Sequence, residues 1–183
     1  GARSDVGCVR PHNEDSYLVQ SPLFCVCDGM GGHAAGEVAS SIAVETIAKT
    51  APQAADAARL AAAVEAANAA VIEAALNGLG KPGMGCTATC AYIENDMLAI
   101  AHVGDSRAYL LHEGTLIRVT RDHSYVEELV DAGEITADEA RVHPNRSVIT
   151  RALGSDPAMY ADHFTLHIEE GDRLILCSDG LSS

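Results

Sequence analysis

The sequence predicts an α+β fold in which two antiparallel β-sheets pack as a central sandwich flanked by helices, in α-β-β-α layers. Strand-like apolar runs lie on both sides of a pair of helical segments, and between residues 86 and 120 four consecutive runs are separated only by turns. A doubly wound parallel sheet would instead need strands that alternate with helices throughout the chain. We therefore expect antiparallel sheets covered by helices.

The first part of the chain contains strand patterns followed by two helix patterns. Residues 4–10 and 16–20 resemble short strands, and residues 23–27 have the continuous apolar character of a buried strand. Residues 35–50 carry apolar side chains at helical spacing, and residues 54–76 form an alanine-rich second helical pattern. Because alanine is small, this second helix is expected to pack closely against its neighbours.

From residue 85 onward the apolar pattern changes to a period of two, which is typical of half-buried strands. Turn residues at 94–96 and 113–114 separate these runs. We expect one β-meander whose four strands cover residues 86–93, 97–103, 108–112 and 116–120.

A charged region over residues 121–150 is expected to form a surface flap. Within it, the pattern predicts a short helix at residues 125–132 and a second helix capped by Thr136. The two last strands are expected at residues 162–168 and 173–177.

Composition narrows the class of protein. A length of 183 residues suits one domain, and a hydrophobic fraction of 48% provides a sizeable core. The sequence has no apolar run of membrane-spanning length and no secretion-signal pattern, so a cytoplasmic setting is expected. The net charge of -14 repels nucleic acid and anionic membranes, and neither is expected as a partner. Binding of phosphate would therefore need local positive charge from a metal ion or an arginine.

The six cysteines lie mostly inside apolar runs and include no Cys-x-x-Cys pair. We interpret them as reduced, small hydrophobic residues. Cys25 and Cys27 would point to the same face of a strand, so a site for a soft metal is a weaker alternative.

Aspartates follow three of the apolar runs, at positions 28, 105 and 179. Asp28 and Asp179 are each followed by glycine, and each Asp-Gly pair taken alone could be an ordinary turn. Together the three aspartates are more carboxylates at buried strand ends than a domain would keep unpaired. A divalent cation is the simplest neutraliser, and oxygen ligands without a His or Cys cluster favour Mg²⁺ or Mn²⁺.

Arg10 precedes a pair of carboxylates, Glu14 and Asp15. An arginine fork matches a phosphate dianion in shape and charge, and an adjacent carboxylate pair can accept hydrogen bonds from water bound to a metal. The alternative interpretation is a solvated charged loop.

These residues fall in motifs that resemble, in order and over essentially the whole chain, the metal-dependent Ser/Thr protein phosphatases of type 2C, the PPM family, and its bacterial branch in particular. The motifs that carry the resemblance are rich in Gly, Asp and Arg and lie at residues 4–7, 10–15, 28–32, 85–89, 102–107, 120–124, 149–154 and 178–180. The resemblance implies the α-β-β-α sandwich. Since family members continue beyond the Ser-Asp-Gly motif, it also implies that residues 1–183 are one catalytic domain that is incomplete at its C-terminus.

The resemblance also implies a set of metal ligands. The residue that matches Asp28 bridges two metal ions, the carbonyl that matches Gly29 binds one of them, and the residue that matches Asp179 ligates the other. Asp105 matches a position that helps to hold a third, weaker ion in bacterial members. The implied cofactors are thus two Mn²⁺ or Mg²⁺ ions with a possible third, and the stretch 121–150 matches a mobile flap that affects substrate choice.

Catalytic roles follow in the same way. Arg10 matches the residue that holds the substrate phosphate, and Glu14 and Asp15 match acidic residues that contact metal-bound water. Some eukaryotic relatives have a histidine where this chain has Met30, and His33 is a candidate substitute as the proton donor, although a surface histidine without a catalytic role is an equal alternative.

The implied activity is hydrolysis of phosphoserine and phosphothreonine in proteins by a metal-activated water, without a phosphoenzyme. The implied partners are phosphorylated proteins, among them Ser/Thr kinases and their substrates, and a monomer is expected. Two alternatives stay open at this point. One is a noncatalytic phosphatase-like domain that binds phosphorylated partners, and the other is a hydrolase of small phosphoesters.

Overall fold

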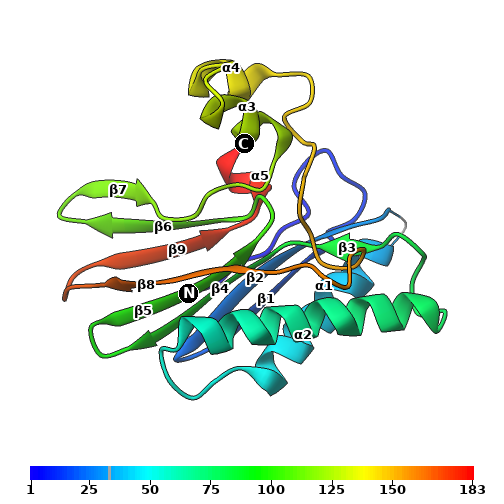
Figure 1. Cartoon of the computed structure of the whole chain (residues 1–183), viewed down its shortest axis with the longest axis horizontal. Coiled ribbons are helices and arrows are strands. Elements are labelled where there is room, and N and C mark those ends of the chain that lie inside the picture. The colour runs from blue at the N-terminus through cyan, green and yellow to red at the C-terminus, as the bar shows by residue number, and fades with distance from the viewer. Residues whose placement is uncertain (33) are drawn as a thin grey trace.

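The structure is a computed structural model that describes residues 1–32 and 34–183. It confirms the predicted α+β fold with two antiparallel sheets (Figure 1). Among the residues described, the larger sheet has six strands, five of which follow the order β1-β2-β4-β5-β8 and are Asp15–Gln20, Leu23–Met30, Ala88–Glu94, Met97–Val103 and Asp162–His167. The short strand β3, Gly85–Cys86, pairs with the end of β2.

The smaller sheet has three strands in the order β7-β6-β9, which are Thr115–Arg118, Arg107–His112 and Arg173–Cys177. The expected single meander is therefore wrong, because β5 pairs with β4 and β8 whereas β6 pairs with β7 and β9. The chain changes sheets at Gly104, whose φ of 105° turns the backbone away after β5. A connection that crosses from one sheet to the other contains turn residues similar to those of a tight hairpin, so the sequence pattern does not distinguish the two.

Two helices cover the outer face of the larger sheet (Figure 1): α1, Ala35–Thr50, and α2, Ala57–Leu76. Their alanines face one another and the sheet, and Ala39, Ala43 and Ala67 are fully buried. Larger side chains such as Ile47 and Leu60 fill the space between the helices and the strands.

A second apolar layer joins the two sheets. Ala91, Leu98, Ile100 and Ala108 are fully buried there and pack against side chains from β8 and β9 such as Phe164. The strand β5 is thus buried on both faces, since helix α2 covers one side and the smaller sheet covers the other. This position explains its apolar sequence, in which His102 is the one polar residue.

The remaining helices lie at one end of the molecule. Helix α5, Asp179–Ser182, follows β9 directly, and α3 and α4, Tyr125–Asp131 and Ala137–Val142, form the projecting flap (Figure 1). The Thr136 cap is confirmed, since its hydroxyl accepts a hydrogen bond from the Glu139 amide at 3.2 Å. Among the residues described, no helix combines the length and the apolar character needed to cross a membrane.

The strand expected at residues 4–10 is wrong, because this segment forms an exposed loop. The Gly7 amide donates a hydrogen bond to Asp5 Oδ1 at 2.9 Å, and Gly7 has a φ of 73°. Such a local side-chain turn competes with strand pairing.

The core predicts a clear contrast within helix α2. Leu60 is fully buried and Leu76 is 82% exposed. We expect Leu60→Ala to lower the free energy of unfolding by about 2–5 kcal/mol, because it leaves a cavity, and Leu76→Ala to change it by less than about 0.5 kcal/mol. Urea unfolding followed by circular dichroism measures both values, and equal losses for the two variants would contradict this packing.

Candidate active site

Carboxylates from both sheets meet at one end of the sandwich. Asp15 begins β1 and lies opposite Asp28 of β2 in the strand register. The Asp179 carboxyl, at the start of α5, and the Asp15 carboxyl lie near enough to the Asp28 carboxyl to raise its pKa. Ser178 Oγ donates a hydrogen bond to Asp15 Oδ2 at 2.8 Å, which ties the end of β9 to the start of β1. The fold thus gathers three of the predicted site residues.

This cluster is electrostatically costly without a cation. Burial, together with the neighbouring Asp179 and Asp15 carboxyl groups, raises the pKa of Asp28 to about 9. At neutral pH the group must therefore hold a proton or face a positive ion. The ligand atoms of these three aspartates do not all lie within 4.8 Å of one another in the described residues, so the group fits divalent cations that each contact some of the carboxylates rather than one ion held by all three.

Asp105 provides an independent sign of a cation. It lies in the connection between β5 and β6, and its Oδ1 atom is buried without a hydrogen-bond partner in the described residues. Burial, together with the charges of Asp179 and Asp122, raises the pKa of its carboxyl group to about 6. A buried carboxylate oxygen without a donor is a strong candidate for a metal ligand. The donor set consists of oxygens only and fits Mg²⁺ or Mn²⁺.

A pair of hydroxyl groups positions the two strand ends. The Asp28 amide donates to Thr87 Oγ1 at 2.9 Å, and the Thr87 amide donates to the Asp28 carbonyl at 2.9 Å. Thr87 Oγ1 also lies 2.6 Å from Ser106 Oγ, next to Asp105. Sequence reasoning did not identify Thr87 and Ser106 as site residues. The feature that marks both residues is a hydroxyl group at a fully buried position in or beside a strand.

The loop after Asp28 approaches helix α1 closely. A side chain at Gly29 would collide with the backbone of Gly36 and of Glu14, and one at Gly36 would collide with the Glu14 carboxylate and the backbone of Gly29. The Gly29 amide donates to the Glu14 carbonyl at 3.1 Å. Glu14 therefore lies between β2 and the start of α1, beside the aspartates rather than hydrogen-bonded to them in the part of the chain described.

A cleft of about 850 Å³ reaches Asp15 and Asp179 of the cluster, whereas Asp28 and Asp105 do not line it. Its lining includes Arg10, Glu14, Asp15 and Asp179. Arg10 lies exposed on the N-terminal loop, where its guanidinium is available to an anion in the cleft. His33, the candidate proton donor, lies outside the described residues.

A histidine beneath the flap supports the Asp105 loop. His123 Nδ1 accepts a hydrogen bond from the Gly104 amide at 2.9 Å, and the His123 amide donates to the Gly104 carbonyl at 2.9 Å. The other ring nitrogen of His123 lies 2.7 Å from Asp162 Oδ2. The second carboxylate oxygen of Asp162, Oδ1, accepts a hydrogen bond from the Arg151 guanidinium at 2.8 Å. These bonds link the base of the predicted flap to the carboxylate cluster, and the sequence did not assign His123 a role.

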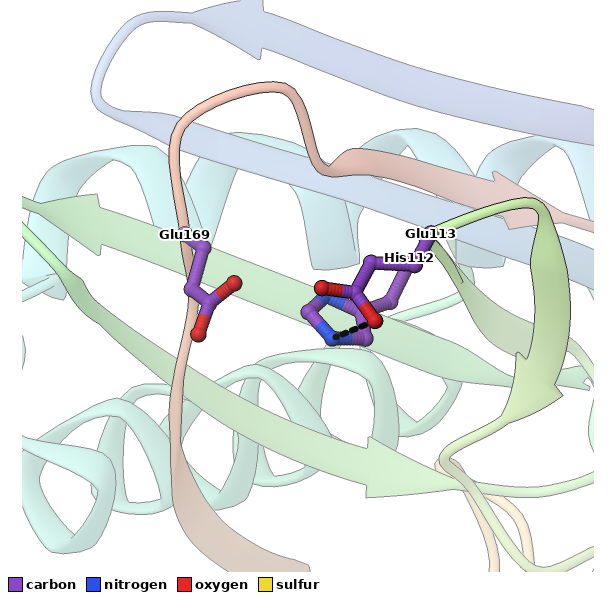
Figure 2. Close-up of side chains that lie close together, drawn as sticks. All are labelled: His112, Glu113 and Glu169. Carbon is purple, nitrogen blue, oxygen red and sulfur yellow. Dashed lines mark ion pairs between the residues drawn. The ribbon is translucent and has the colours of Figure 1, made fainter.

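A separate acidic cluster lies at the opposite end of β6. Figure 2 shows His112 beside Glu113, with Glu169 facing them from the β8–β9 turn. His112 Nδ1 is hydrogen-bonded to Asp172 at 2.7 Å, and this bond raises the pKa of the imidazole, which favours its charged form. We interpret this cluster as ion pairing at the surface and as separate from the candidate active site.

An antiparallel α+β sandwich with a buried carboxylate cluster at one end defines a class of protein suited to divalent metal ions. Comparison with known proteins identifies the family within this class. The family model of protein phosphatase 2C matches residues 3–182, and the chain belongs to this family.

Two relatives are similar to nearly the whole of this chain. The chain is 44% identical over 187 residues to the serine/threonine protein phosphatase PstP of Mycobacterium tuberculosis, which covers 99% of this chain and 36% of PstP. It is 38% identical over 193 residues to the serine/threonine phosphatase stp of Listeria monocytogenes, covering 99% of this chain and 77% of that protein. The chain thus spans about a third of the length of PstP.

Solved structures agree with the fold. The crystal structure of the M. tuberculosis phosphatase PstP/Ppp superposes with a TM-score of 0.92 at 43% identity, over 98% of this chain and 77% of that one. The catalytic domain of PstP in complex with two manganese ions gives a TM-score of 0.88 at 41% identity, over 98% and 76% of the two chains.

The raised pKa of Asp28 predicts a pH dependence of stability. In metal-free protein the folded state holds a proton on Asp28 that the unfolded state releases near its ordinary pKa of 3.8. Between that value and about 9 the folded state binds more protons, so this residue makes stability fall as pH rises. In EDTA we expect Asp28→Asn to melt at a higher temperature than the unsubstituted chain, by a margin that grows from about pH 5 to about pH 8.

Asp96→Asn is the matched control for this measurement, because Asp96 is an exposed carboxylate in the β4–β5 turn. Thermal melts followed by circular dichroism give the comparison. A lower melting temperature for Asp28→Asn at about pH 8 in EDTA would show that Asp28 is not a destabilising buried charge.

Proposed function

We propose that this chain is a catalytic domain that hydrolyses phosphoserine and phosphothreonine in proteins in a reaction that depends on Mn²⁺ or Mg²⁺. The observation that carries the proposal is the convergence of the half-buried Asp15 and Asp179 on the buried Asp28, with the unpaired oxygen of Asp105 in the adjoining loop. Membership of the protein phosphatase 2C family supports it, as does the likeness to a manganese-bound PstP domain.

In the proposed site, Asp28, Asp179 and the Gly29 carbonyl would hold two divalent cations, and Asp105 would hold a third, weaker one. Such cations would supply activation of a water molecule and neutralisation of charge on the phosphoryl oxygens, so that no phosphoenzyme would be needed. Two observations support this assignment: the pKa of Asp28 is raised, and the buried Asp105 Oδ1 has no hydrogen-bond donor in the described residues.

The remaining residues bind and orient the substrate. Arg10 holds the phosphate at the mouth of the cleft with its planar donor fork. Asp15, fixed by Ser178, and Glu14, held beside helix α1, accept hydrogen bonds from the attacking water and fix its direction. His33 is the proposed proton donor to the departing alkoxide.

The substrates we propose are phosphorylated proteins, namely Ser/Thr kinases and their targets, which makes the role one of signalling. We also infer a monomer that works in the cytoplasm and does not bind nucleic acid or membranes. The net charge of -14 supports the last point, and free thiols at Cys8 and at five buried cysteines suit a reducing compartment.

Hydrolysis of a phosphothreonine peptide tests the proposal. We expect turnover with Mn²⁺ that EDTA abolishes, and we expect Asp28→Asn to lower kcat/KM by about 10³-fold or more because a cation ligand worth several kcal/mol is lost. Asp96→Asn should retain full activity, since Asp96 lies in an exposed turn. Binding of the phosphopeptide without any turnover would favour the noncatalytic alternative, and turnover in EDTA would refute the metal-dependent one.

The role of Arg10 gives a separate prediction. Loss of a charge-assisted contact to phosphate worth about 1.5–3 kcal/mol should raise KM for the phosphopeptide by about 10- to 100-fold in Arg10→Ala. Because the contact is made in the ground state as well, kcat should change much less. Arg59→Ala on the exposed start of helix α2 is the control. An unchanged KM in Arg10→Ala would remove Arg10 from the phosphate site.

A further inference from the structure

Four cysteines form a row inside the core, on the face of the larger sheet that the helices cover. Cys25, Cys27, Cys86 and Cys90 are 0–1% exposed and belong to the apolar cluster that includes α1 and α2. Cys25 Sγ lies 2.9 Å from Cys90 Sγ and 3.7 Å from Cys27 Sγ. The proposed phosphatase reaction uses none of these thiols, so their arrangement needs a separate explanation.

The four sulfurs do not surround a single metal ion. Within residues 1–32 and 34–183, three or more His, Cys, Asp or Glu ligand atoms come within 4.8 Å of one another only at His112, Glu113 and Glu169 (Figure 2). The cysteine row is therefore extended along the sheet, and the structure does not favour the soft-metal alternative that the sequence left open for Cys25 and Cys27.

One pair of cysteines in the row is placed so that a disulfide bond could join its members. Cys25 of β2 lies directly opposite Cys90 of β4 in the strand register. Opposite residues in antiparallel strands have Cα atoms about 4.5–5.5 Å apart, within the range of about 4.4–6.8 Å that a disulfide spans. Cys27, on the same strand as Cys25, lies opposite Ser16 of β1 and not opposite another cysteine in that pairing. A bond between Cys25 and Cys90 thus needs no shift of either strand.

We propose that Cys25 and Cys90 are an oxidative modification site, at which peroxide converts two thiols of neighbouring strands into one disulfide. One of the two sulfurs attacks a peroxide oxygen, which forms a sulfenic acid and releases one water. The other sulfur then attacks the sulfenic sulfur, the S–S bond forms and a second water leaves, so that two thiols and one hydrogen peroxide give one disulfide and two waters.

Burial selects the oxidant and the product. Hydrogen peroxide is small and uncharged, so it can reach an apolar interior during local opening of the helical layer, whereas a bulky disulfide reagent requires far larger opening. Because Cys90 Sγ is the nearest recorded partner of Cys25 Sγ, the sulfenic acid is captured before a second peroxide converts it to sulfinic acid. The bond would join β2 to β4 three residues before Asp28.

Peptide mapping of the folded chain tests this proposal and does not depend on the proposed function. The protein is treated with excess hydrogen peroxide, unfolded, alkylated, digested and analysed by mass spectrometry without reductant. We expect a cross-linked peptide pair joining Cys25 to Cys90, a loss of about two mass units for the bond, and recovery of both thiols after dithiothreitol. The exposed Cys8 serves as the internal sign that the oxidant has acted.

Two variants sharpen the result. Cys90→Ala should abolish the cross-link, and Cys177→Ala should retain it, because Cys177 is also buried but lies on β9 of the other sheet. Full alkylation of Cys25 and Cys90 after Cys8 has been oxidised would overturn the proposal, as would a bond between Cys25 and Cys27. The map of the unsubstituted chain decides the matter even if Cys90→Ala does not fold.

Discussion

Repulsion among buried carboxylates is the constraint around which this molecule is arranged. Asp28 is almost fully buried and faces Asp179 and Asp15, so the folded state must balance negative charges in a region of low polarity. This arrangement lowers the stability of the folded state, so stability alone does not explain why these groups lie together. The two apolar layers therefore act as a support that holds an unfavourable arrangement in place.

The support works through backbone contacts and small side chains. The end of β2 is held on one side by Thr87 and on the other by the contact between Gly29 and Gly36. The Asp105 loop is held by His123 from below and joined to Thr87 through Ser106. Because hydroxyl groups and glycines have few rotamers or none, these contacts leave the carboxylates little freedom to move apart.

Local patterns predicted much of this fold. Helix α1 and strand β5 were predicted with the correct ends, because a 3.6-residue or continuous apolar pattern is bounded in each case by polar or breaking residues. Residues 4–10 were predicted wrongly as a strand, since a side-chain turn at Asp5 is invisible to apolar periodicity. The division of the meander between two sheets was also missed, because strand pairing depends on long-range burial that neighbouring residues do not encode.

The site was predictable to a similar degree. Strand-end position indicated Asp28, Asp105 and Asp179, since a carboxylate after an apolar run has few structural uses. The supporting residues Thr87, Ser106 and His123 could not be assigned, because a hydroxyl or imidazole in an apolar run gains its role only from the segment that packs against it. Their partners lie on other strands or loops and come together only after the sheets have formed.

The hydrogen bond from Ser178 to Asp15 joins two residues that are 163 positions apart in the chain. The carboxylate cluster consequently has no precursor in any short segment, and a ribosome must release nearly all of this sequence before the ligands can meet. Cation affinity is then a property of the finished topology, and a cation held by Asp28 and Asp179 would oppose the separation of two segments that lie far apart in the sequence.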